Sequence, residues 1–404
     1  MREEAFNMTK KCIFLTGATG YLGSNLLPEF VKNGYKLKLL VRPQKMNPHE
    51  RVVQSLSKID NKQLTVNQIM QNIEIFEGDI IKKNLGLTET VIRNLSKEVT
   101  DVFHCAAAVS FDEEKESLLR KHNINGTKNI LSFTDMLDNA HLHYMSTAYV
   151  CGRKNGIVKE DEFDDKRGFN NSYEKIKHAA ELLVKSWENK YQAKTIIYRP
   201  SVIIGDSDTG KNLSSYGLYG MFKTVDIGMR KLKIEFKKGN PYLKNAGIKL
   251  SGDTFFVPLR VLGNLNKTIN LITIDYATRA IIHIFNNADS IGKAYHITNS
   301  SPPTMKVLKD CMCKVLKVTG TEFVLPKDIR NNPVKIWEKQ FNEGLKLYSP
   351  YLLLDEPVFD DANTKNILRN TYVSQAKIDE VLITKLLTYC YSTKYGKISN
   401  PPDK

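Results

Sequence analysis

The sequence predicts an α/β fold, a Rossmann-type doubly wound parallel sheet with a smaller, mostly helical C-terminal lobe. Three observations lead to this prediction. Apolar strands alternate with helical patterns over the first two-thirds of the 404 residues, as in a parallel sheet covered by helices on both faces. The first strand runs into a glycine-rich turn that opens a helix. From about Ser300 onward the pattern is mostly helical and is interrupted by prolines.

Each expected element follows from its local pattern. Short apolar runs indicate six strands, at 11–16, 36–41, 73–77, 101–105, 141–145 and 195–198. Helices are expected to begin at Tyr21, near Asn125 and around Asn171, and the polar stretch 44–72 is compatible with a helical excursion. Residues 207–254 lose the alternation, and residues 270–286 regain strong periodicity. We therefore expect a dinucleotide-binding domain of residues 1–206 plus about 255–299, and a second lobe of about 207–254 plus 300–404.

Composition limits the class of protein. Hydrophobic residues make up 41% and charged residues 25% of the chain, which is typical of a folded soluble protein, and no apolar run approaches the roughly 18 residues of a membrane helix. The N-terminus lacks a signal-peptide pattern, so a cytoplasmic protein without stable membrane insertion is expected. Six cysteines without regular spacing predict neither a disulfide framework nor a metal site.

The net charge of +15 favours acidic partners, such as nucleotides, an acidic carrier protein or nucleic acid. No nucleic-acid-binding motif is present, so no nucleic-acid partner is expected. A lysine-rich solvated surface explains the charge equally well. The sequence does not indicate an oligomeric state.

The glycine-rich turn is the first candidate binding site. Three glycines follow an apolar strand with the spacing G-x-x-G-x-x-G. Glycine is needed where the backbone turns sharply or approaches a phosphate closely, and the free N–H groups of a helix start can hold a pyrophosphate. The residues of this turn are therefore candidate cofactor ligands: Thr16, Gly17, Thr19, Gly20, Tyr21, Leu22 and Gly23.

The end of the second strand indicates which dinucleotide would bind. This strand ends in Arg42, and no Asp or Glu occurs between Lys36 and Pro48, where an NAD enzyme would place a carboxylate for the ribose 2′-hydroxyl. A guanidinium matches a 2′-phosphate instead. NADPH is therefore the predicted cofactor, although a surface arginine would give the same pattern.

Two later strand ends suit the rest of a dinucleotide. Asp79 follows the third strand, where its carboxylate can accept a hydrogen bond from the adenine amino group while Ile80 packs on the ring. The fourth strand ends in the small residues Ala106, Ala107 and Ala108, which would let the cofactor lie against the backbone. An ordinary buried turn would also use alanines.

Tyr173 and Lys177 are candidate catalytic residues because they are four positions apart, and hence lie on one face of a helix. A phenol beside a fixed ammonium is a proton donor, and we expect its pKa to be lowered. Thr147 ends the fifth strand, at the edge of the sheet where ligands bind, and its hydroxyl can donate to a carbonyl oxygen. A dinucleotide-binding turn and a proton-donating tyrosine together indicate hydride transfer to or from a carbonyl.

These segments together resemble the extended short-chain dehydrogenase/reductase superfamily. Seven ordered matches over about 200 residues carry the resemblance: TGATGYLG from Thr16, GDI from Gly78, HCAA from His104, NINGT from Asn123, STA from Ser146, Tyr173-x-x-x-Lys177 and YRPSVIIG from Tyr198. Other details are similar to the thioester reductase and fatty acyl-CoA reductase branch: LVRP from Leu40, NLGL from Asn84, AVSF from Ala108, STAYV from Ser146 and NLITIDY from Asn270.

The resemblance implies a function and adds cofactor ligands. That branch uses NADPH and a Thr–Tyr–Lys triad, here Thr147, Tyr173 and Lys177, to reduce acyl thioesters on carrier proteins or coenzyme A to aldehydes, with an alcohol as the product of a second reduction. Its motifs add four cofactor-binding candidates: Asn123, Pro200, Ser201 and Val202. Alternatives of the same fold are a sugar-nucleotide epimerase or dehydratase and a ketone reductase of hydroxysteroid or flavonol type. A non-catalytic NADP-binding regulator is a further alternative, which would need neither the tyrosine nor the lysine.

The second lobe is expected to bind the substrate. Lysines and apolar residues alternate within its first part, and the apolar groups could line an acyl tunnel while the lysines meet a phosphopantetheine phosphate or an acidic carrier. The lysines are Lys223, Lys231, Lys233, Lys237, Lys238 and Lys244, and the apolar residues are Phe222, Ile234, Phe236 and Tyr242. A solvated cover over an ordinary cleft is the alternative.

Overall fold

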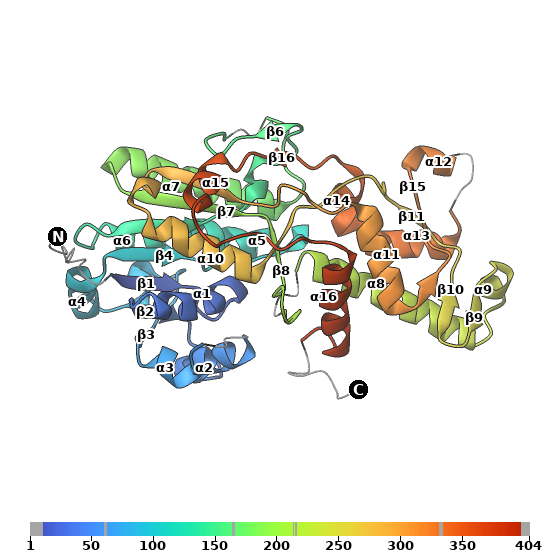
Figure 1. Cartoon of the computed structure of the whole chain (residues 1–404), viewed down its shortest axis with the longest axis horizontal. Helices are drawn as coiled ribbons and strands as arrows, with labels where there is room; N and C mark the ends of the chain where they lie inside the picture. Colours follow the sequence, from blue (N-terminus) through green and yellow to red (C-terminus); the bar gives the residue numbers. More distant parts are fainter. Residues whose placement is uncertain are drawn as a thin grey trace.

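A seven-stranded, entirely parallel sheet forms the centre of the protein (Figure 1). The structure is a computed structural model, and it describes residues 11–59, 63–163, 166–212, 214, 216–330 and 334–396. The strand order is β13-β7-β5-β4-β1-β2-β3. The strands are β1 (Cys12–Thr16), β2 (Lys36–Val41), β3 (Ile73–Glu77), β4 (Asp101–His104), β5 (His141–Met145), β7 (Thr195–Pro200) and β13 (Lys293–Ile297). The predicted Rossmann-type fold is confirmed, with β13 as a seventh strand that the sequence pattern missed.

Helices cover both faces of the sheet because its strands are apolar on both sides. In β1, Ile13 and Leu15 pack into the core on one face and Phe14 into the core on the other. The helices of the first face are α1 (Tyr21–Lys32), α2 (Pro48–Lys58), α3 (Val66–Met70), α10 (Ile274–Asn286) and α15 (Ala362–Leu368). The helices of the second face are α4 (Glu89–Glu98), α6 (Gly126–Thr134) and α7 (Ser172–Tyr191). The starts of α1 and α7 agree with the expected helix starts. The helix expected to begin near Asn125 begins earlier, because α5 (Glu116–Leu119) runs through a π-helical segment, Arg120–Asn125, directly into α6.

A second apolar core lies beyond the carboxyl end of the sheet, in the half of the molecule that holds α8 and α11 in Figure 1. Its helices are α8 (Leu218–Lys237), α9 (Pro241–Asn245), α11 (Met305–Leu316), α12 (Pro326–Arg330), α13 (Ile336–Gly344), α14 (Ser349–Leu353) and α16 (Glu380–Ser392). Its strands are β9 (Lys249–Ser251), β10 (Thr254–Phe256), β11 (Arg260–Leu262), β14 (Val318–Thr319) and β15 (Glu322–Val324). A two-stranded pair, β8 (Val202–Ile204) with β12 (Leu271–Thr273), connects this lobe to the sheet.

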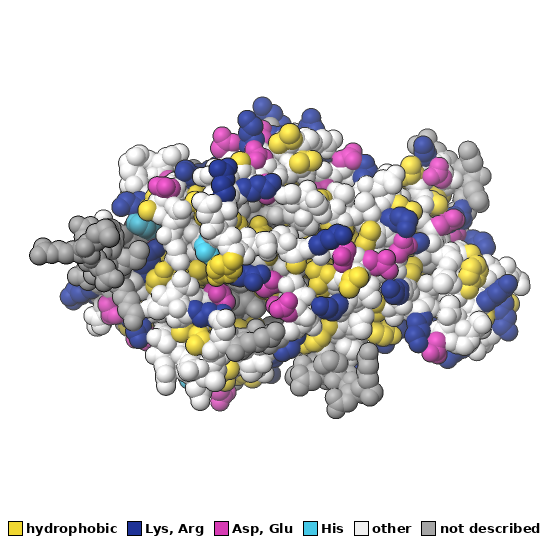
Figure 2. Space-filling model, viewed as in Figure 1, with side chains coloured by type: hydrophobic (Ala, Val, Ile, Leu, Met, Phe, Trp, Pro, Cys, Tyr) yellow, Lys and Arg dark blue, Asp and Glu magenta, His cyan; other side chains and the backbone are white. Residues whose placement is uncertain are grey.

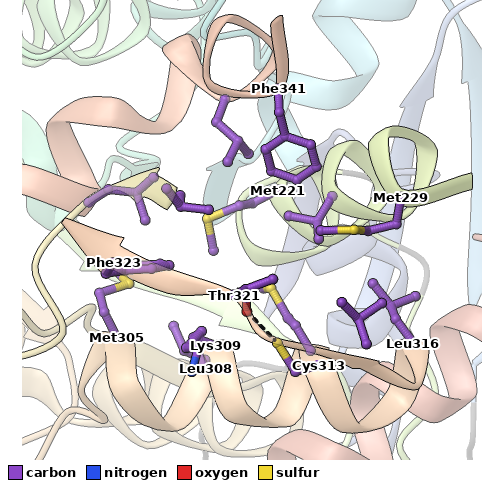
Figure 3. A pocket seen from close by; sticks show the side chains of 16 residues that line it. Met221, Met229, Met305, Leu308, Lys309, Cys313, Leu316, Thr321, Phe323 and Phe341 are labelled. Carbon is purple, nitrogen blue, oxygen red and sulfur yellow. Dashed lines mark hydrogen bonds between the residues drawn. The ribbon is translucent and has the colours of Figure 1, made fainter. Parts of the chain in front are cut away.

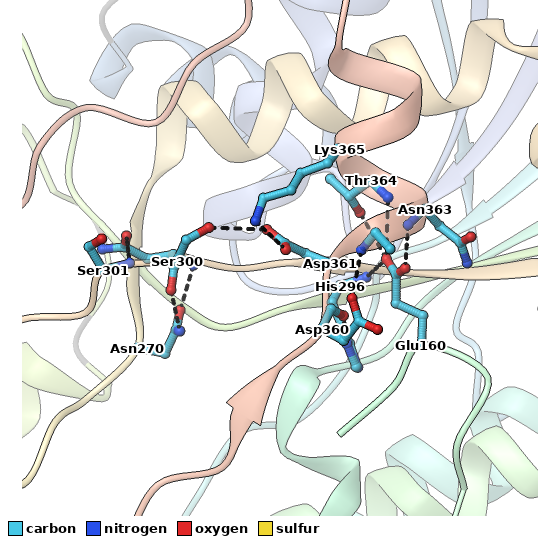
Figure 4. A network of polar contacts seen from close by, with 12 residues as sticks. Glu160, Asn270, His296, Ser300, Ser301, Asp360, Asp361, Asn363, Thr364 and Lys365 are labelled. Atoms are coloured by element: carbon cyan, nitrogen blue, oxygen red, sulfur yellow. Dashed lines mark hydrogen bonds and ion pairs between the residues drawn. The ribbon is translucent and has the colours of Figure 1, made fainter. Parts of the chain in front are cut away.

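Residues 348–373, which we term the C-terminal strap, run back from the lobe to the sheet. Within the strap, β16 (Val358–Phe359) pairs in parallel with β6 (Ile157–Val158). The carboxylate of Glu160 accepts hydrogen bonds from the backbone N–H groups of His296 (2.8 Å) and Asn363 (2.6 Å), and so holds the start of α15 beside β13 (Figure 4). The strap therefore joins the last sheet strand to the lobe.

This packing does not follow the expected domain boundaries. Phe255, Val257 and Val261 belong to the core of the lobe, although residues from about 255 were expected in the dinucleotide-binding domain. Leu368 and Val373 of the strap belong instead to the core beneath α1 and α10. Both departures arise from pairing between segments distant in sequence, which no local pattern reports. Among the described residues, no helix combines the length and the apolar character that crossing a membrane requires.

Candidate functional site

The glycine-rich turn forms an open cradle at the carboxyl end of β1. Gly17 has a φ of +81°, and a Cβ atom there would lie 2.7 Å from the backbone nitrogen of Ala106. A Cβ on Gly23 would lie 2.2 Å from the Gly17 oxygen. Neither position tolerates a side chain, and no side chain caps α1 at Gly20. The first N–H groups of α1 therefore face a space that suits an anion.

Other residues of the turn hold its backbone in position through contacts with the core and with β8. The Tyr21 hydroxyl donates to the carbonyl of Ile204 in β8 (2.9 Å), and Leu22 packs against the core under α1. Thr16 is fully buried, and its Oγ1 lies 2.9 Å from Nδ1 of His104. Burial lowers the pKa of His104 to about 3, so the ring is neutral and serves as a hydrogen-bonding spacer.

The alanine loop after β4 is held in place from the π-helical segment Arg120–Asn125, which precedes α6. Asn123 is buried and exchanges two hydrogen bonds with the backbone of Ala108, one from the Ala108 N–H (2.8 Å) and one to its carbonyl (2.9 Å). The Ala106 N–H donates to Thr16 (3.3 Å), so this loop lies directly against the cradle, with Ala107 exposed between the two anchored alanines. The structure thus brings Thr16 of β1, the alanines after β4 and Asn123 to one place.

Asp79 and Ile80 lie at the carboxyl end of β3, as expected from the sequence. One carboxylate oxygen of Asp79 accepts a hydrogen bond from the Ile81 N–H (3.2 Å). Ile80 packs so closely on α6 that a Cβ on Gly126 would lie 2.7 Å from its side chain. Both residues therefore have fixed positions beside the cradle.

A second arginine accompanies Arg42, and sequence reasoning missed it. Arg51 of α2 donates from Nη1 to the carbonyl of Arg42 (2.5 Å) and from Nη2 to Oγ1 of Thr19 (3.2 Å). Burial, and then the charge of Arg42, lower the pKa of Arg51. The Arg51 guanidinium thus lies against Thr19 of the glycine-rich turn, with the charge of Arg42 near enough to act on it. The sequence contains a signal for the helix that carries Arg51, because Asn47 is its N-cap and Pro48 its first residue.

Thr147 and Lys177 lie around the carboxyl end of β5. Lys177 is buried in α7 and donates from Nζ to the hydroxyl of Tyr144 (2.9 Å) and to the carbonyl of Met145 (2.6 Å), two residues before Thr147. The Thr147 hydroxyl donates to the carbonyl of Pro200 at 3.4 Å. Tyr173 is the second residue of α7, one turn before Lys177. The triad candidates thus share one region of the sheet edge.

The expected lowering of the Tyr173 pKa is wrong. Burial, and then the charge of Glu174, raise the pKa of Tyr173 to about 12. Burial lowers the pKa of Lys177 to about 8. The reason is geometric, because the ammonium is directed at Tyr144 and Met145, while Glu174 follows Tyr173 in the chain. At neutral pH Tyr173 therefore keeps its proton and is a hydrogen-bond donor.

A buried ion pair supports this edge. Arg199 and Glu181 are both inaccessible to solvent and contact each other at 2.5 Å. The other oxygen of Glu181 accepts a hydrogen bond from Ser146, the residue before Thr147. Arg199 also donates to the carbonyls of Glu160 (3.0 Å) and Glu162 (3.3 Å). The pair therefore ties α7, β7 and the end of β5 together.

Aromatic side chains form a wall beside Tyr173. The ring of Phe111 lies 6.3 Å from that of Tyr173, 6.2 Å from that of Tyr348 and 5.5 Å from that of Tyr351, measured between centroids. The hydroxyl of Tyr351 donates to Glu174 (2.6 Å). The C-terminal strap thus contributes two rings to the site, which the sequence pattern did not reveal.

The loop between β7 and β8 contains an unsatisfied hydroxyl. The N–H groups of Ser201 and Val202 donate to the carbonyls of Ile297 (3.0 Å) and Asn270 (3.2 Å), which fixes the backbone after Pro200. The Oγ of Ser201 is buried and has no hydrogen-bond partner within the described part of the chain. A buried hydroxyl of this kind needs a partner, which a ligand lying along the loop would supply.

The residues expected to line an acyl tunnel do not lie together. Phe222 is fully buried in the core of the lobe, whereas Ile234 and Tyr242 are 54% and 82% exposed. Phe236 packs against the ring of Phe255 instead. In the face shown in Figure 2, lysines and arginines are spread over the surface with acidic residues among them. Four of the six lysines are exposed: Lys231, Lys237, Lys238 and Lys244.

The described residues fit the pyrophosphate of a dinucleotide. The cradle has no room for side chains, the helix start is uncapped, and the Arg51 guanidinium lies beside it at Thr19. Within the described ranges, no three His, Cys, Asp or Glu residues are grouped so as to hold a metal ion.

Comparisons with known proteins identify relatives of this chain. The family model described as male sterility protein matches residues 15–281. A nonribosomal peptide synthetase of Aspergillus flavus is 26% identical over 369 residues, which cover 88% of this chain and 32% of that protein. Fatty acyl-CoA reductase 1 of Gallus gallus is 30% identical over 152 residues, which cover 36% of this chain and 29% of that protein. The chain thus spans about a third of the length of these relatives.

The fold is shared with solved structures. The terminal R domain of the myxalamid PKS-NRPS biosynthetic pathway superposes with a TM-score of 0.74 at 22% identity, covering 97% of this chain and 93% of that domain.

Proposed function

Because the chain belongs to the male sterility protein family, within the thioester reductase branch of the extended short-chain dehydrogenase/reductases, we propose that it reduces an acyl thioester to an aldehyde with NADPH. The observation that carries the proposal is the position of Thr147, Tyr173 and Lys177 on the same sheet edge as the open glycine cradle. A thioester reductase requires a nicotinamide site and hydroxyl donors for one carbonyl oxygen, and this edge offers both.

The protein's own groups act on the carbonyl oxygen. A bound NADPH would supply the hydride, so that thioester, NADPH and one proton give aldehyde, thiol and NADP⁺. Tyr173, protonated because its pKa is raised, and Thr147 would donate hydrogen bonds to the oxygen as it becomes an alkoxide. The nearby ammonium of Lys177 would stabilise that negative charge. When the carbonyl re-forms, the C–S bond breaks and its electron pair leaves with the thiolate, which takes a proton from water.

The preference for NADPH is a separate part of the proposal. Arg42, Arg51 and Thr19 would hold the 2′-phosphate, since the Arg51 guanidinium contacts both the Thr19 hydroxyl and the backbone carbonyl of Arg42. No carboxylate is contributed by the segment between Lys36 and Pro48 to repel that phosphate.

The thioester would be carried by coenzyme A or by a carrier protein. Acyl-carrier docking is supported by four exposed lysines of α8, its C-cap and α9, which are Lys231, Lys237, Lys238 and Lys244, and by the nonribosomal peptide synthetase among the relatives. Exposed charges attract an acidic partner over a Debye length of about 8 Å at physiological salt. The KM for a carrier-bound thioester should therefore rise with added salt, and that of a small uncharged thioester should rise much less.

The test measures NADPH oxidation with acyl-CoA, acyl-carrier-protein, sugar-nucleotide and ketone substrates, with the carbonyl product trapped and identified. Thioesters should give an aldehyde and one equivalent of free thiol. Turnover of a ketone or a sugar nucleotide in the absence of any thioester turnover would contradict the proposal. Tyr173→Phe is the control for oxidation that does not depend on the site.

A further inference from the structure

Lys177 is a buried ammonium without a direct counter-charge, since no carboxylate of the described residues forms an ion pair with it. The other buried lysine of the described chain, Lys38, contacts two glutamate carboxylates, at 2.6 Å and 3.1 Å. Lys309, which lines an apolar cavity of the lobe (Figure 3), contacts the carboxylate of Asp310 at 3.2 Å. A buried charge is costly unless it is paired or hydrogen-bonded, so uncharged groups must stabilise Lys177.

Tyr144 is the side chain that holds this ammonium. The Nζ of Lys177 donates to the Tyr144 hydroxyl at 2.9 Å and lies 4.3 Å from the centroid of the same ring, and both contacts favour the charged form. The second hydrogen bond goes to the backbone carbonyl of Met145 (2.6 Å). Tyr144 is only 1% exposed, so water does not take the place of its hydroxyl.

The Tyr144 hydroxyl stays neutral and has a defined direction. Burial, and then the charge of Glu181, raise the pKa of Tyr144 well above its ordinary value, while hydrogen bonding with Thr127 opposes this rise. Because the hydroxyl oxygen accepts from Lys177, its proton is directed toward Thr127. The hydroxyl is therefore an acceptor for Lys177 and a donor to Thr127.

Thr127 can accept that proton because of its own neighbours. Its hydroxyl donates to the carbonyl of Asn123 (2.7 Å), and its Oγ1 lies 3.2 Å from Nε2 of His104, which must then be the donor. The Nδ1 of His104 is left to accept from the Thr16 hydroxyl (2.9 Å). One lone pair of Thr127 thus remains for Tyr144, and the chain of hydrogen bonds continues to Thr16 at the start of the glycine-rich turn.

The other titratable groups around Lys177 do not replace this contact. They lie on α7 and around the end of β4, and they are Glu181, Tyr173, His104 and Cys105. Burial lowers the pKa of Lys177 to about 8, and the charges of Glu181 and then Cys105 oppose this only in part. His104 is neutral and Tyr173 keeps its proton. The charge of the ammonium near neutral pH therefore depends on the Tyr144 hydroxyl.

We propose that Tyr144 is a positioning residue of the site, whose hydroxyl, oriented by Thr127 and His104, holds the Lys177 ammonium at the carboxyl end of β5. Tyr144 acts through Lys177, because its own side chain is buried. Its effect on turnover rests on the proposed function, whereas the contact itself does not. A charge fixed before the reaction needs no reorganisation as the alkoxide forms.

The test compares Tyr144→Phe with Tyr198→Phe. Tyr144→Phe keeps the ring and removes the hydroxyl, so the alkaline fall of kcat/KM should move about one pH unit toward acid, as expected for the loss of one hydrogen bond to a charged group. Tyr198 is the matched control, because it is fully buried and its hydroxyl lies 3.0 Å from Nδ1 of His143, on the opposite face of the sheet. Tyr198→Phe should keep the alkaline fall of the unmodified enzyme.

A stability measurement tests the contact without any substrate. A lysine whose pKa is lowered on folding makes the protein more stable as the pH rises through the folded value, and this rise should begin at lower pH in Tyr144→Phe. The cost of Tyr144→Phe in urea unfolding should therefore be largest below pH 7 and shrink as the pH rises through about 8. In a Lys177→Met background the cost should not depend on pH.

The outcomes separate the two proposals. If thioesters are reduced and Tyr144→Phe keeps the alkaline fall of the unmodified enzyme, or Tyr198→Phe shifts it equally, the role of Tyr144 is wrong and the proposed function stands. If no thioester is reduced, the proposed function is wrong, and the pH dependence of the unfolding cost alone decides the contact. Should Tyr144→Phe not fold, Thr127→Val removes the group that orients the hydroxyl and should shift the fall in the same direction; an unchanged fall would overturn the proposal.

Discussion

Replacing Glu181 with glutamine tests the buried ion pair beside the catalytic strand. The substitution keeps the size of the side chain and leaves the Arg199 guanidinium, which is inaccessible to solvent, without a counter-charge. Removing one partner of a buried pair costs about 3–5 kcal/mol in the free energy of unfolding. We expect Glu181→Gln to fall in this range because Arg199 has no route to water.

The double variant Glu181→Met/Arg199→Met is the matched control. It removes both charges, so no buried charge is left unpaired, and the hydrogen bonds lost outside the pair are those of Arg199 to two backbone carbonyls and that of Ser146 to Glu181. Its cost should be smaller, about 1–3 kcal/mol for the carbonyls left unsatisfied. Urea unfolding measures both values, as midpoint shifts at unchanged m-value.

The pH dependence of the free energy of unfolding is an independent test of the ion pair. Burial alone would raise the pKa of Glu181, but Arg199, and then Ser146, hold it below its ordinary value. A depressed carboxyl pKa contributes stability above the unfolded pKa, and this contribution is lost as the pH falls through the folded value. The difference between the unmodified protein and Glu181→Gln should therefore shrink in acid. A cost below 1 kcal/mol for Glu181→Gln, or a double variant as costly as the single one, would refute the reasoning.

Three further predictions concern the site. Arg51→Ala should weaken NADPH binding about 10- to 150-fold in titrations, equivalent to about 1.5–3 kcal/mol for hydrogen bonds to a charged group. The affinity of this variant for NADH, and the NADPH affinity of the control Lys58→Ala, should be nearly unchanged. Equal losses for both dinucleotides would exclude the 2′-phosphate role. Tyr173→Phe should lower kcat roughly 10²–10⁴-fold at unchanged NADPH affinity, and full activity would remove this tyrosine from the mechanism. Because the pKa of Lys177 is about 8, kcat/KM should fall as the pH rises through that value and the ammonium loses its proton, and Lys177→Arg should flatten this limb; a flat profile in the unmodified enzyme would contradict it.

The fold could be predicted because its signals are local. Buried parallel strands are continuous apolar runs, so β1 to β5 and β7 were recognisable from the sequence. The edge strand β13 and the two-residue strand β16 depend on pairing with distant partners and leave no such signal. The strap also contacts the sheet half through residues distant in sequence, so the sequence analysis assigned all of it to the second lobe.

The site was predictable as a set of positions and not as an electrostatic arrangement. The glycine spacing requires a cradle at Gly17 and Gly23, and the structure has one. The spacing of Tyr173 and Lys177 puts both on one helix face, but it does not reveal that the ammonium is directed at Tyr144. Direction and burial decide the pKa of each group, and both are tertiary properties.

The path of the strap determines the order in which the protein can fold during synthesis. Leu368 and Val373 complete the core that also contains α1 and α10, so the sheet half of the molecule stays open on this face until those residues have left the ribosome. At about 5–20 residues per second, the interval between the emergence of α10 and that of the strap is on the order of 10 s. During this interval the nascent chain exposes the apolar face of α10 that α15 later covers.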